Sequence, residues 1–175
     1  MALPYEAGPQ HILLPARGSF MTLTLVLALV ANLLPWRGLT GLPDWVALVI
    51  VFWSVHQPRR MGIGFAWVLG LVMDAANGAL LGQHAFAYSL LSFGAMALSR
   101  RMLWFSPWSQ ALHVFLLLLG AQVMVVAVRL FAGGSFPGAW YFAGSMISAV
   151  LWPVVTFLLL APQRKPEVFD GNRPL

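Results

Sequence analysis

Residues 61–82 read MGIGFAWVLGLVMDAANGALLG and carry the densest pattern in the chain. Small residues recur at every fourth position, and positions four apart stay on one side of an α-helix. The first part of the stretch therefore predicts a narrow face of small side chains that another helix can approach closely. The face consists of Gly62, Ala66 and Gly70, and the register continues through Asp74 to Gly78 and Gly82.

The helix that packs on this small-residue face can belong to the same chain or to another protein. No hydrophobic force acts between helices in lipid, so close van der Waals contact has to supply their association. We expect internal packing first, and contact with a partner's helix is the sharper alternative. Both interpretations stay open for Gly62, Ala66 and Gly70.

Apart from Asp44, which begins the expected span near 44–57, Asp74 is the only acidic residue within an expected membrane span. It lies 13 residues beyond Met61, which is about 20 Å along a helix and close to the far boundary of a bilayer. An intramembrane carboxylate is a functional-site candidate by default. Asn77-Gly78 follows as a turn signal, so we expect Asp74 to bind free backbone groups around that turn. Proton relay and ligand binding are the alternatives.

The composition indicates that lipid surrounds much of the chain. Of the 175 residues, 9% are charged and 60% are hydrophobic, and the mean hydropathy is +0.81. An ordinary soluble domain is about 25% charged, so the polar residues needed to cover a globule are missing. This composition excludes a disordered chain, and the absence of cysteine excludes a disulfide scaffold.

Six apolar runs separate the charged residues, and four of them exceed or approach the ~20 residues that cross a bilayer. The two short runs lie on either side of Arg59 and Arg60. If both were a hairpin dipping into the membrane, these arginines would lie in hydrocarbon at a cost of a few kcal/mol each. We therefore predict an all-α, polytopic transmembrane helix bundle with about six spans, near residues 18–36, 44–57, 61–76, 79–99, 107–131 and 138–161.

The distribution of basic residues predicts the orientation of these spans. With a cytoplasmic N-terminus, 8 of the 10 basic residues lie inside and only Arg37 and Arg129 lie outside, as the positive-inside rule favours. Residues 1–17 then form a flexible cytoplasmic leader and residues 162–175 a cytoplasmic tail, so both termini are inside. The topology anchors in this scheme are two arginine pairs, Arg59 with Arg60 and Arg100 with Arg101.

Other functional classes find little support in the sequence. The four histidines, at positions 11, 56, 84 and 113, have no ligand spacing and cysteine is absent, so we expect no metal site. No hydrolase, metalloprotease or phosphate-loop motif occurs, which predicts no catalytic site and no cofactor. The basic residues are too dispersed for nucleic-acid binding.

Several segments together resemble the MreD family of rod shape-determining proteins. The resemblance covers nearly the whole chain, and its core is the G-x-x-x-D-x-x-x-G-x-x-x-G pattern from Gly70 to Gly82. Further matching segments are Pro43-Asp44-Trp45, Trp53, Pro58-Arg59-Arg60, Gly62, Ala85, Trp108-Ser109-Gln110-Ala111 and Leu151-Trp152-Pro153.

The resemblance implies a non-catalytic component of the bacterial inner membrane that helps to maintain cell shape. It implies MreC as the direct partner, and through MreC the MreB filaments, RodA and a class B penicillin-binding protein of lateral peptidoglycan synthesis. The family fold is similar to that of the substrate-binding subunits of energy-coupling-factor transporters. The alternative function is therefore a small-molecule-binding membrane subunit, for which the candidate polar residues are Asn32, Asp74, Asn77, Gln83, His84 and Gln122.

Overall fold

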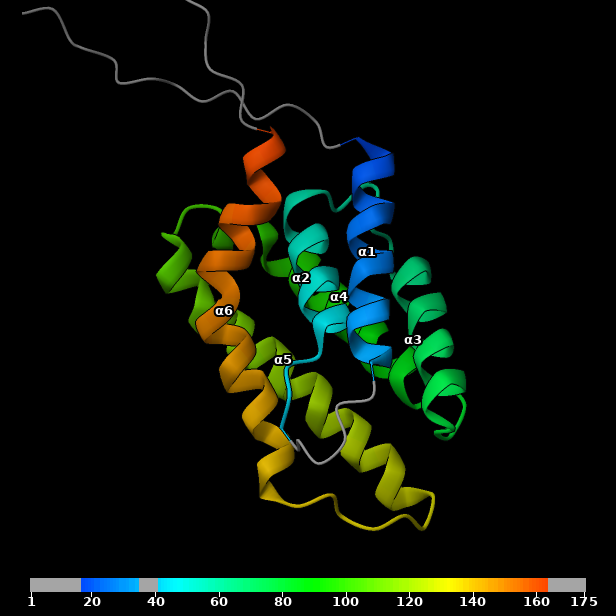
Figure 1. Cartoon of the computed structure of the whole chain (residues 1–175). Helices are drawn as coiled ribbons and strands as arrows, with labels where there is room; N and C mark the ends of the chain where they lie inside the picture. Colours follow the sequence, from blue (N-terminus) through cyan, green and yellow to red (C-terminus); the bar gives the residue numbers. More distant parts are fainter. Residues whose placement is uncertain (1–16, 35–40, 164–175) are drawn as a thin grey trace, which may run out of the picture.

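The computed structural model describes residues 17–34 and 41–163, and within these ranges it contains six α-helices and no strand. Consecutive helices run in alternating directions, with α5 tilted across the others (Figure 1). The predicted all-α class is confirmed. The helices are α1 (Gly18–Leu33), α2 (Trp45–His56), α3 (Ile63–Asn77), α4 (Gln83–Met102), α5 (Pro107–Phe131) and α6 (Ala143–Leu160), with short 3-10 turns η1 (Ala139–Phe142) and η2 (Ala161–Gln163) around α6.

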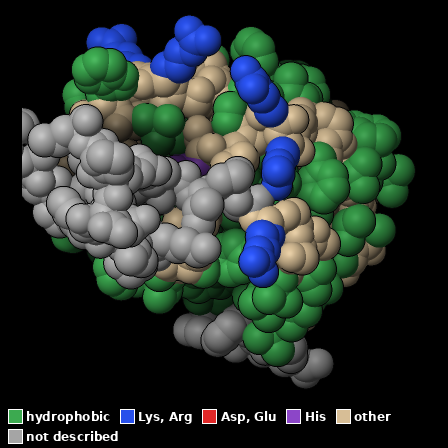
Figure 2. Space-filling model, turned by 90° about the horizontal axis from the view of Figure 1, so that it is seen from above, with side chains coloured by type: hydrophobic (Ala, Val, Ile, Leu, Met, Phe, Trp, Pro, Cys, Tyr) green, Lys and Arg blue, Asp and Glu red, His purple; other side chains and the backbone are tan. Residues whose placement is uncertain are grey.

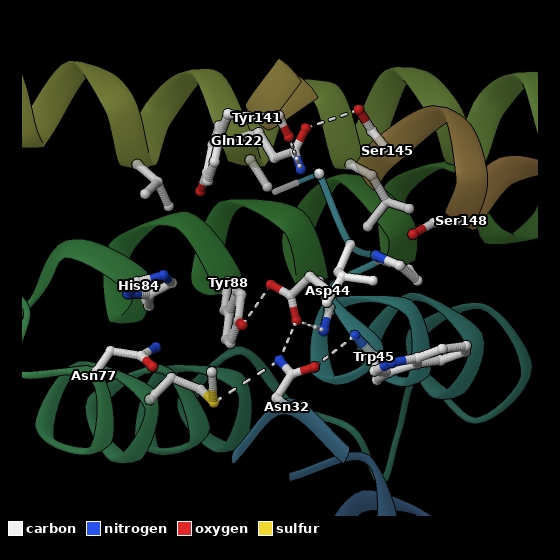
Figure 3. A pocket seen from close by; sticks show the side chains of 18 of the residues that line it. Asn32, Asp44, Trp45, Asn77, His84, Tyr88, Gln122, Tyr141, Ser145 and Ser148 are labelled. Atoms are coloured by element: carbon white, nitrogen blue, oxygen red, sulfur yellow. Dashed lines mark hydrogen bonds between the residues drawn. The ribbon is translucent and has the colours of Figure 1, made fainter. Parts of the chain in front are cut away.

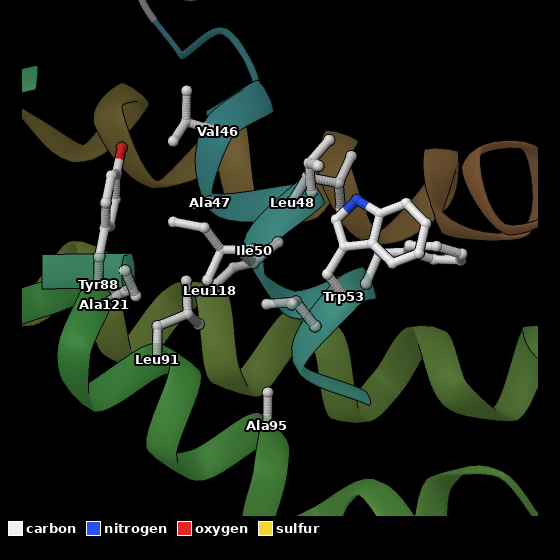
Figure 4. Close-up of a cluster of buried hydrophobic side chains, with 14 of the residues drawn as sticks. Val46, Ala47, Leu48, Ile50, Trp53, Tyr88, Leu91, Ala95, Leu118 and Ala121 are labelled. Atoms are coloured by element: carbon white, nitrogen blue, oxygen red, sulfur yellow. The ribbon is translucent and has the colours of Figure 1, made fainter. Parts of the chain in front are cut away.

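Helix α2 forms the centre of the bundle. All residues from Val46 to Val55 are buried, and α1, α4, α5 and α6 contact the helix from different sides. A helix that is apolar all round its circumference is typical of such a buried position or of a membrane span. Its side chains interlock with Leu91 and Leu118 of the neighbouring helices (Figure 4).

Buried polar pairs join α2 and its neighbours. The Trp53 indole N–H donates to the Thr24 hydroxyl of α1 at 3.0 Å. The Ser54 and Ser92 hydroxyls lie 3.0 Å apart and connect α2 to α4. Hydrogen bonds of this kind between apolar helices fix their register, because an unpaired polar group is costly in a low-dielectric interior.

Glycine permits the tight turn between α3 and α4. Gly78 (φ 59°) and Gly82 (φ 100°) both have left-handed backbone conformations, which cost glycine nothing and strain other residues. The Ala79 N–H donates back to the Asp74 carbonyl at 2.9 Å and closes the end of α3. The turn therefore occupies residues that we expected in a span near 79–99, and the helix instead extends from Gln83 to Met102.

The outer surface of the bundle is largely apolar. The α5 helix and the segment Ala139–Gln163 around α6 are long and apolar enough to cross a membrane, and α1, α2 and α3 are shorter apolar helices. Large side chains on the outward faces of α5 and α6 are exposed, among them Leu112, Leu116, Val150 and Leu158. Such a surface is unusual in water and typical of helices that face lipid.

Basic side chains gather at one end of the bundle, called here the arginine end. Arg17 precedes α1, Arg59 and Arg60 lie between α2 and α3, and Arg100 and Arg101 end α4. Figure 2 looks onto this end and shows basic side chains spread across it, with no acidic side chain in view. The leader up to residue 16, Arg37 and the tail from residue 164 lie outside the described residues.

Candidate functional site

Asp74 is fully buried at the end of α3 and faces the first turn of α4. Its carboxylate accepts the backbone N–H groups of Gly82 and His84, both at 2.8 Å, and that of Ala85 at 3.4 Å. The first N–H groups of a helix have no partner within the helix and carry partial positive charge. Asp74 thus caps α4 from the preceding helix, which is the turn-fixing role.

His84 gives Asp74 a side-chain partner that sequence reasoning missed. The His84 Nδ1 atom lies 2.7 Å from Asp74 Oδ1. The two residues are ten positions apart, so helical spacing did not connect them. Only the Gly78–Gly82 turn, which reverses the chain, brings His84 back to α3.

The structure places part of the small-residue face against α4 of the same chain. Ala66 is fully buried. At Gly70, a Cβ atom would lie 2.3 Å from the Ala85 Cα atom and 2.4 Å from its backbone nitrogen, so α4 touches the α3 backbone directly. Gly62 has open space around it instead, and Gly78 and Gly82 form the turn.

A second carboxylate, that of the half-buried Asp44, connects three helices. Its Oδ1 atom accepts the Asn32 amide of α1 at 2.8 Å and the Ala47 N–H of α2 at 3.0 Å. Its Oδ2 atom accepts the Tyr88 hydroxyl of α4 at 2.6 Å. The Asn32 carbonyl in turn accepts the Trp45 N–H at 2.9 Å. Asp44 therefore caps α2 and locks α1 and α4 to its N-terminus.

These polar groups line a cavity of about 400 Å³, called here the central cavity (Figure 3). The cavity lies beyond the N-terminus of α2. With 12 residues, α2 is about 18 Å long, whereas the 25-residue α5 is about 37 Å long. The short central helix leaves this space between longer neighbours. Its polar lining residues are Asn32, Asp44, Asn77, His84, Tyr88, Gln122, Tyr141, Ser145 and Ser148.

The far wall of the central cavity is formed by α5 and α6. The Ser145 hydroxyl donates to the Gln122 carbonyl at 2.8 Å, and the Gln122 amide donates to the Tyr141 backbone at 3.3 Å. Gly144 lies so close to the loop before α2 that a Cβ there would be 2.4 Å from the Leu42 carbonyl oxygen. These contacts close the cavity on the α6 side.

A wider space of about 690 Å³, called here the vestibule, adjoins the central cavity. Both are lined by Asn77, His84 and Tyr141. The vestibule alone also contacts Gln83 and the exposed Arg129 near the end of α5. Polar groups from helices that are distant in sequence thus converge on two adjacent spaces.

The sequence identified some of these residues and missed others. Asn32, Asn77, His84 and Gln122 line the central cavity and Gln83 lines the vestibule, whereas Asp74 lines neither. The missed residues include Asp44 and Tyr88, which are 44 positions apart and meet only in the folded chain. A detectable signal was Asp44 itself, an N-cap residue directly before an apolar run. Within the described ranges, no cluster of three His, Asp or Glu residues could hold a metal ion.

The apolar exterior, the basic end and the polar cavity together define an all-helical bundle with the surface of a membrane protein. The family model for the rod shape-determining protein MreD matches residues 16–161. A rod shape-determining protein MreD from Haemophilus influenzae is 31% identical over 149 residues, covering 82% of this chain and 90% of that protein. No solved structure matches. The chain belongs to the MreD family of rod shape-determining proteins.

Family membership confirms the resemblance and assigns the chain a role in cell shape. MreD proteins are membrane proteins of the rod shape-determining system and are not known as enzymes. This assignment does not depend on the cavity, for which the family name supplies no role.

Proposed function

We propose that this chain is a non-catalytic, six-span component of the bacterial inner membrane that scaffolds MreC. Through MreC it would connect to MreB, RodA and a class B penicillin-binding protein during lateral peptidoglycan synthesis. Family membership carries the proposal, because it assigns the chain to the rod shape-determining system. The apolar exterior supports a position within the bilayer, where a bitopic partner can dock.

The proposed orientation has the arginine end in the cytoplasm. Arg59, Arg60, Arg100 and Arg101 lie at this end together with Arg17, whereas Arg129 lies near the opposite end. Basic residues near short loops are retained on the cytoplasmic side of bacterial membranes. The central cavity and the vestibule would then face the periplasm, and both termini would be cytoplasmic.

Single cysteines test this orientation, because the chain has none of its own. Leu81 (72% exposed) lies in the α3–α4 turn and Trp104 (90% exposed) lies between α4 and α5. In intact spheroplasts, a thiol reagent that cannot cross membranes should label Leu81→Cys and leave Trp104→Cys unlabelled. After lysis both variants should react. Labelling of Trp104→Cys in intact spheroplasts would reverse the proposed orientation.

The structure limits the part of the small-residue face that a partner helix could contact. Ala66 is buried and Gly70 is covered by α4, so a variant at Gly70 would disturb the fold before it could report on a partner. A Cβ atom added at Gly62, just before α3, would have nothing within 4 Å, and the same holds at Gly64. We propose this open beginning of α3 as the contact for the MreC membrane helix.

Replacing Gly62 with leucine should lower the yield of co-purified MreC several-fold, because the side chain blocks close approach of a helix. Gly62 has φ −76° and open surroundings, so leucine fits without strain. Gly120→Leu is the matched control, since Gly120 on α5 also has open space around it. Co-purification from membranes with equal amounts of both variants measures the effect. Equal MreC yields from both variants would place the contact elsewhere.

The cavity favours a second candidate function, a membrane subunit that binds a small molecule, similar to the substrate-binding components of energy-coupling-factor transporters. Such a binder needs convergent polar groups within an enclosed space. The observation in its favour is that residues of α1, α2, α3, α4, α5 and α6 all contribute to the lining of the central cavity.

A further inference from the structure

The polar groups around the cavity fall into two sets, those satisfied within the chain and those left for a ligand. Asn32 and Asp44 bond to each other and to backbone groups, and Gln122 bonds to Ser145. Among the described residues, the Tyr141 hydroxyl and the Asn77 amide make no hydrogen bond, and His84 uses only its Nδ1 atom. The uncommitted groups are those shared by the central cavity and the vestibule.

The two carboxylates near this opening are each occupied by the start of a helix. Asp44 accepts three hydrogen bonds at the N-terminus of α2. Asp74 accepts the N–H groups at the start of α4 and the His84 ring. A carboxylate in such a position is compensated by the partial positive charge of the helix end. Neither Asp44 nor Asp74 lines the vestibule, so neither carboxylate faces a cation there.

Arg129 is the charged side chain of the vestibule that could bind a ligand. It is exposed, lines the vestibule, and forms no ion pair with any residue that the structure describes. The following loop turns back over it, since the Gly134 N–H donates to the Arg129 carbonyl at 2.9 Å. A Cβ atom at Gly134 would lie 2.8 Å from Arg129 Cγ, so this loop packs directly on the arginine stem.

We propose that the vestibule binds a phosphate group, held by Arg129 with Asn77, His84 and Tyr141 as further hydrogen-bonding groups. A guanidinium pairs with phosphate through two parallel hydrogen bonds, and the Asn77, His84 and Tyr141 side chains, which line the same space, can supply further hydrogen bonds. The apolar lining of the central cavity, including Met73, Leu118 and Val125, would receive an apolar part of the same ligand.

An anionic phospholipid is one source of this phosphate, and a soluble phosphate ester is the other. The lipid source rests on the membrane position proposed above. Two of the segments that border the vestibule, residues 77–84 and 125–134, also carry the exposed side chains of Leu81 and Phe131. Lipid headgroups would therefore lie beside the vestibule. The phosphate chemistry is common to both sources.

Binding of phosphatidylglycerol to the purified full-length protein in neutral detergent tests the proposal. Native mass spectrometry should detect one retained lipid per chain, and diacylglycerol, which lacks the phosphate, should be lost. Arg129→Gln should weaken phosphatidylglycerol binding at least about tenfold, because it removes the charge-assisted pair. Arg101→Gln is the matched control, since Arg101 is an exposed arginine at the arginine end. Thermal unfolding, followed by tryptophan fluorescence, checks that both variants fold.

Glycerol 3-phosphate distinguishes the two sources. If it raises the unfolding temperature of the wild type but not of Arg129→Gln, the site takes a soluble phosphate; if only phosphatidylglycerol does so, the site takes a lipid. Equal retention of diacylglycerol and phosphatidylglycerol would overturn the proposal, as would undiminished binding by Arg129→Gln or an equal loss in Arg101→Gln. These measurements contain no MreC, so their failure leaves the scaffolding proposal standing.

Discussion

Replacing Asp74 with alanine is expected to lower the free energy of unfolding by about 3 kcal/mol or more. The variant leaves the Gly82 and His84 N–H groups without the carboxylate that now accepts them at 2.8 Å. Each buried donor left unpaired costs about 1–3 kcal/mol, and the His84 ring loses its partner as well. For a chain of this size, the unfolding temperature in detergent should fall by roughly 10 °C.

Asn77→Ala provides the matched control for Asp74→Ala. Asn77 ends the same helix three residues later, but it is exposed and makes no hydrogen bond among the described residues. Its replacement should change the unfolding temperature little. If Asp74→Ala unfolds at the same temperature as Asn77→Ala, the carboxylate does not hold the α3–α4 turn, and its burial needs another explanation.

Gly70→Ala is expected to destabilise the protein by about 3 kcal/mol, although it adds a single methyl group. The new Cβ would lie 2.3 Å from Ala85 Cα and 2.6 Å from the His84 carbonyl carbon. These are backbone atoms, so the clash can be relieved only by moving α4 away from α3, and overpacking of this kind typically costs about 1–3 kcal/mol or more. Chemical or thermal unfolding in detergent measures the loss.

Gly64→Ala is the control on the same helix. Gly64 has open space around it, and alanine in a helix interior is more stable than glycine by about 1 kcal/mol. The same substitution should therefore be neutral or stabilising at position 64 and strongly destabilising at position 70. Equal stability of the two variants would mean that α4 does not approach the α3 backbone as closely as the structure shows.

Most helix ends in this chain carry local sequence signals. Asp44 before an apolar run marks the start of α2, and Pro107 marks the first turn of α5. The exception was the start of α4. The apolar character of residues 79–82 continued the run, whereas Gly78 and Gly82 require a left-handed backbone that ends the helix. Hydropathy indicates whether a segment prefers an apolar or an aqueous environment, and it says nothing about the backbone conformation.

The candidate site could be predicted only in part. Asp74 was a candidate because it is an acidic residue in an apolar stretch. The Asn77-Gly78 signal indicated the turn that Asp74 holds. The partners of the two carboxylates could not be found in the same way, because His84 reaches Asp74 across a chain reversal and Tyr88 reaches Asp44 from another helix. The sequence also could not decide what covers Gly70, for which the structure provides α4.

The sequence by itself determined that this chain is an apolar helical bundle with one basic end, because hydropathy and charge are properties of the residues and act wherever the chain folds. The sequence was also sufficient to identify the protein family. Only the tertiary structure decided that the short α2 lies at the centre and leaves a cavity beyond its N-terminus. The lengths of neighbouring helices, and the polar groups that meet in the space between them, are set by packing between segments that are far apart in the chain.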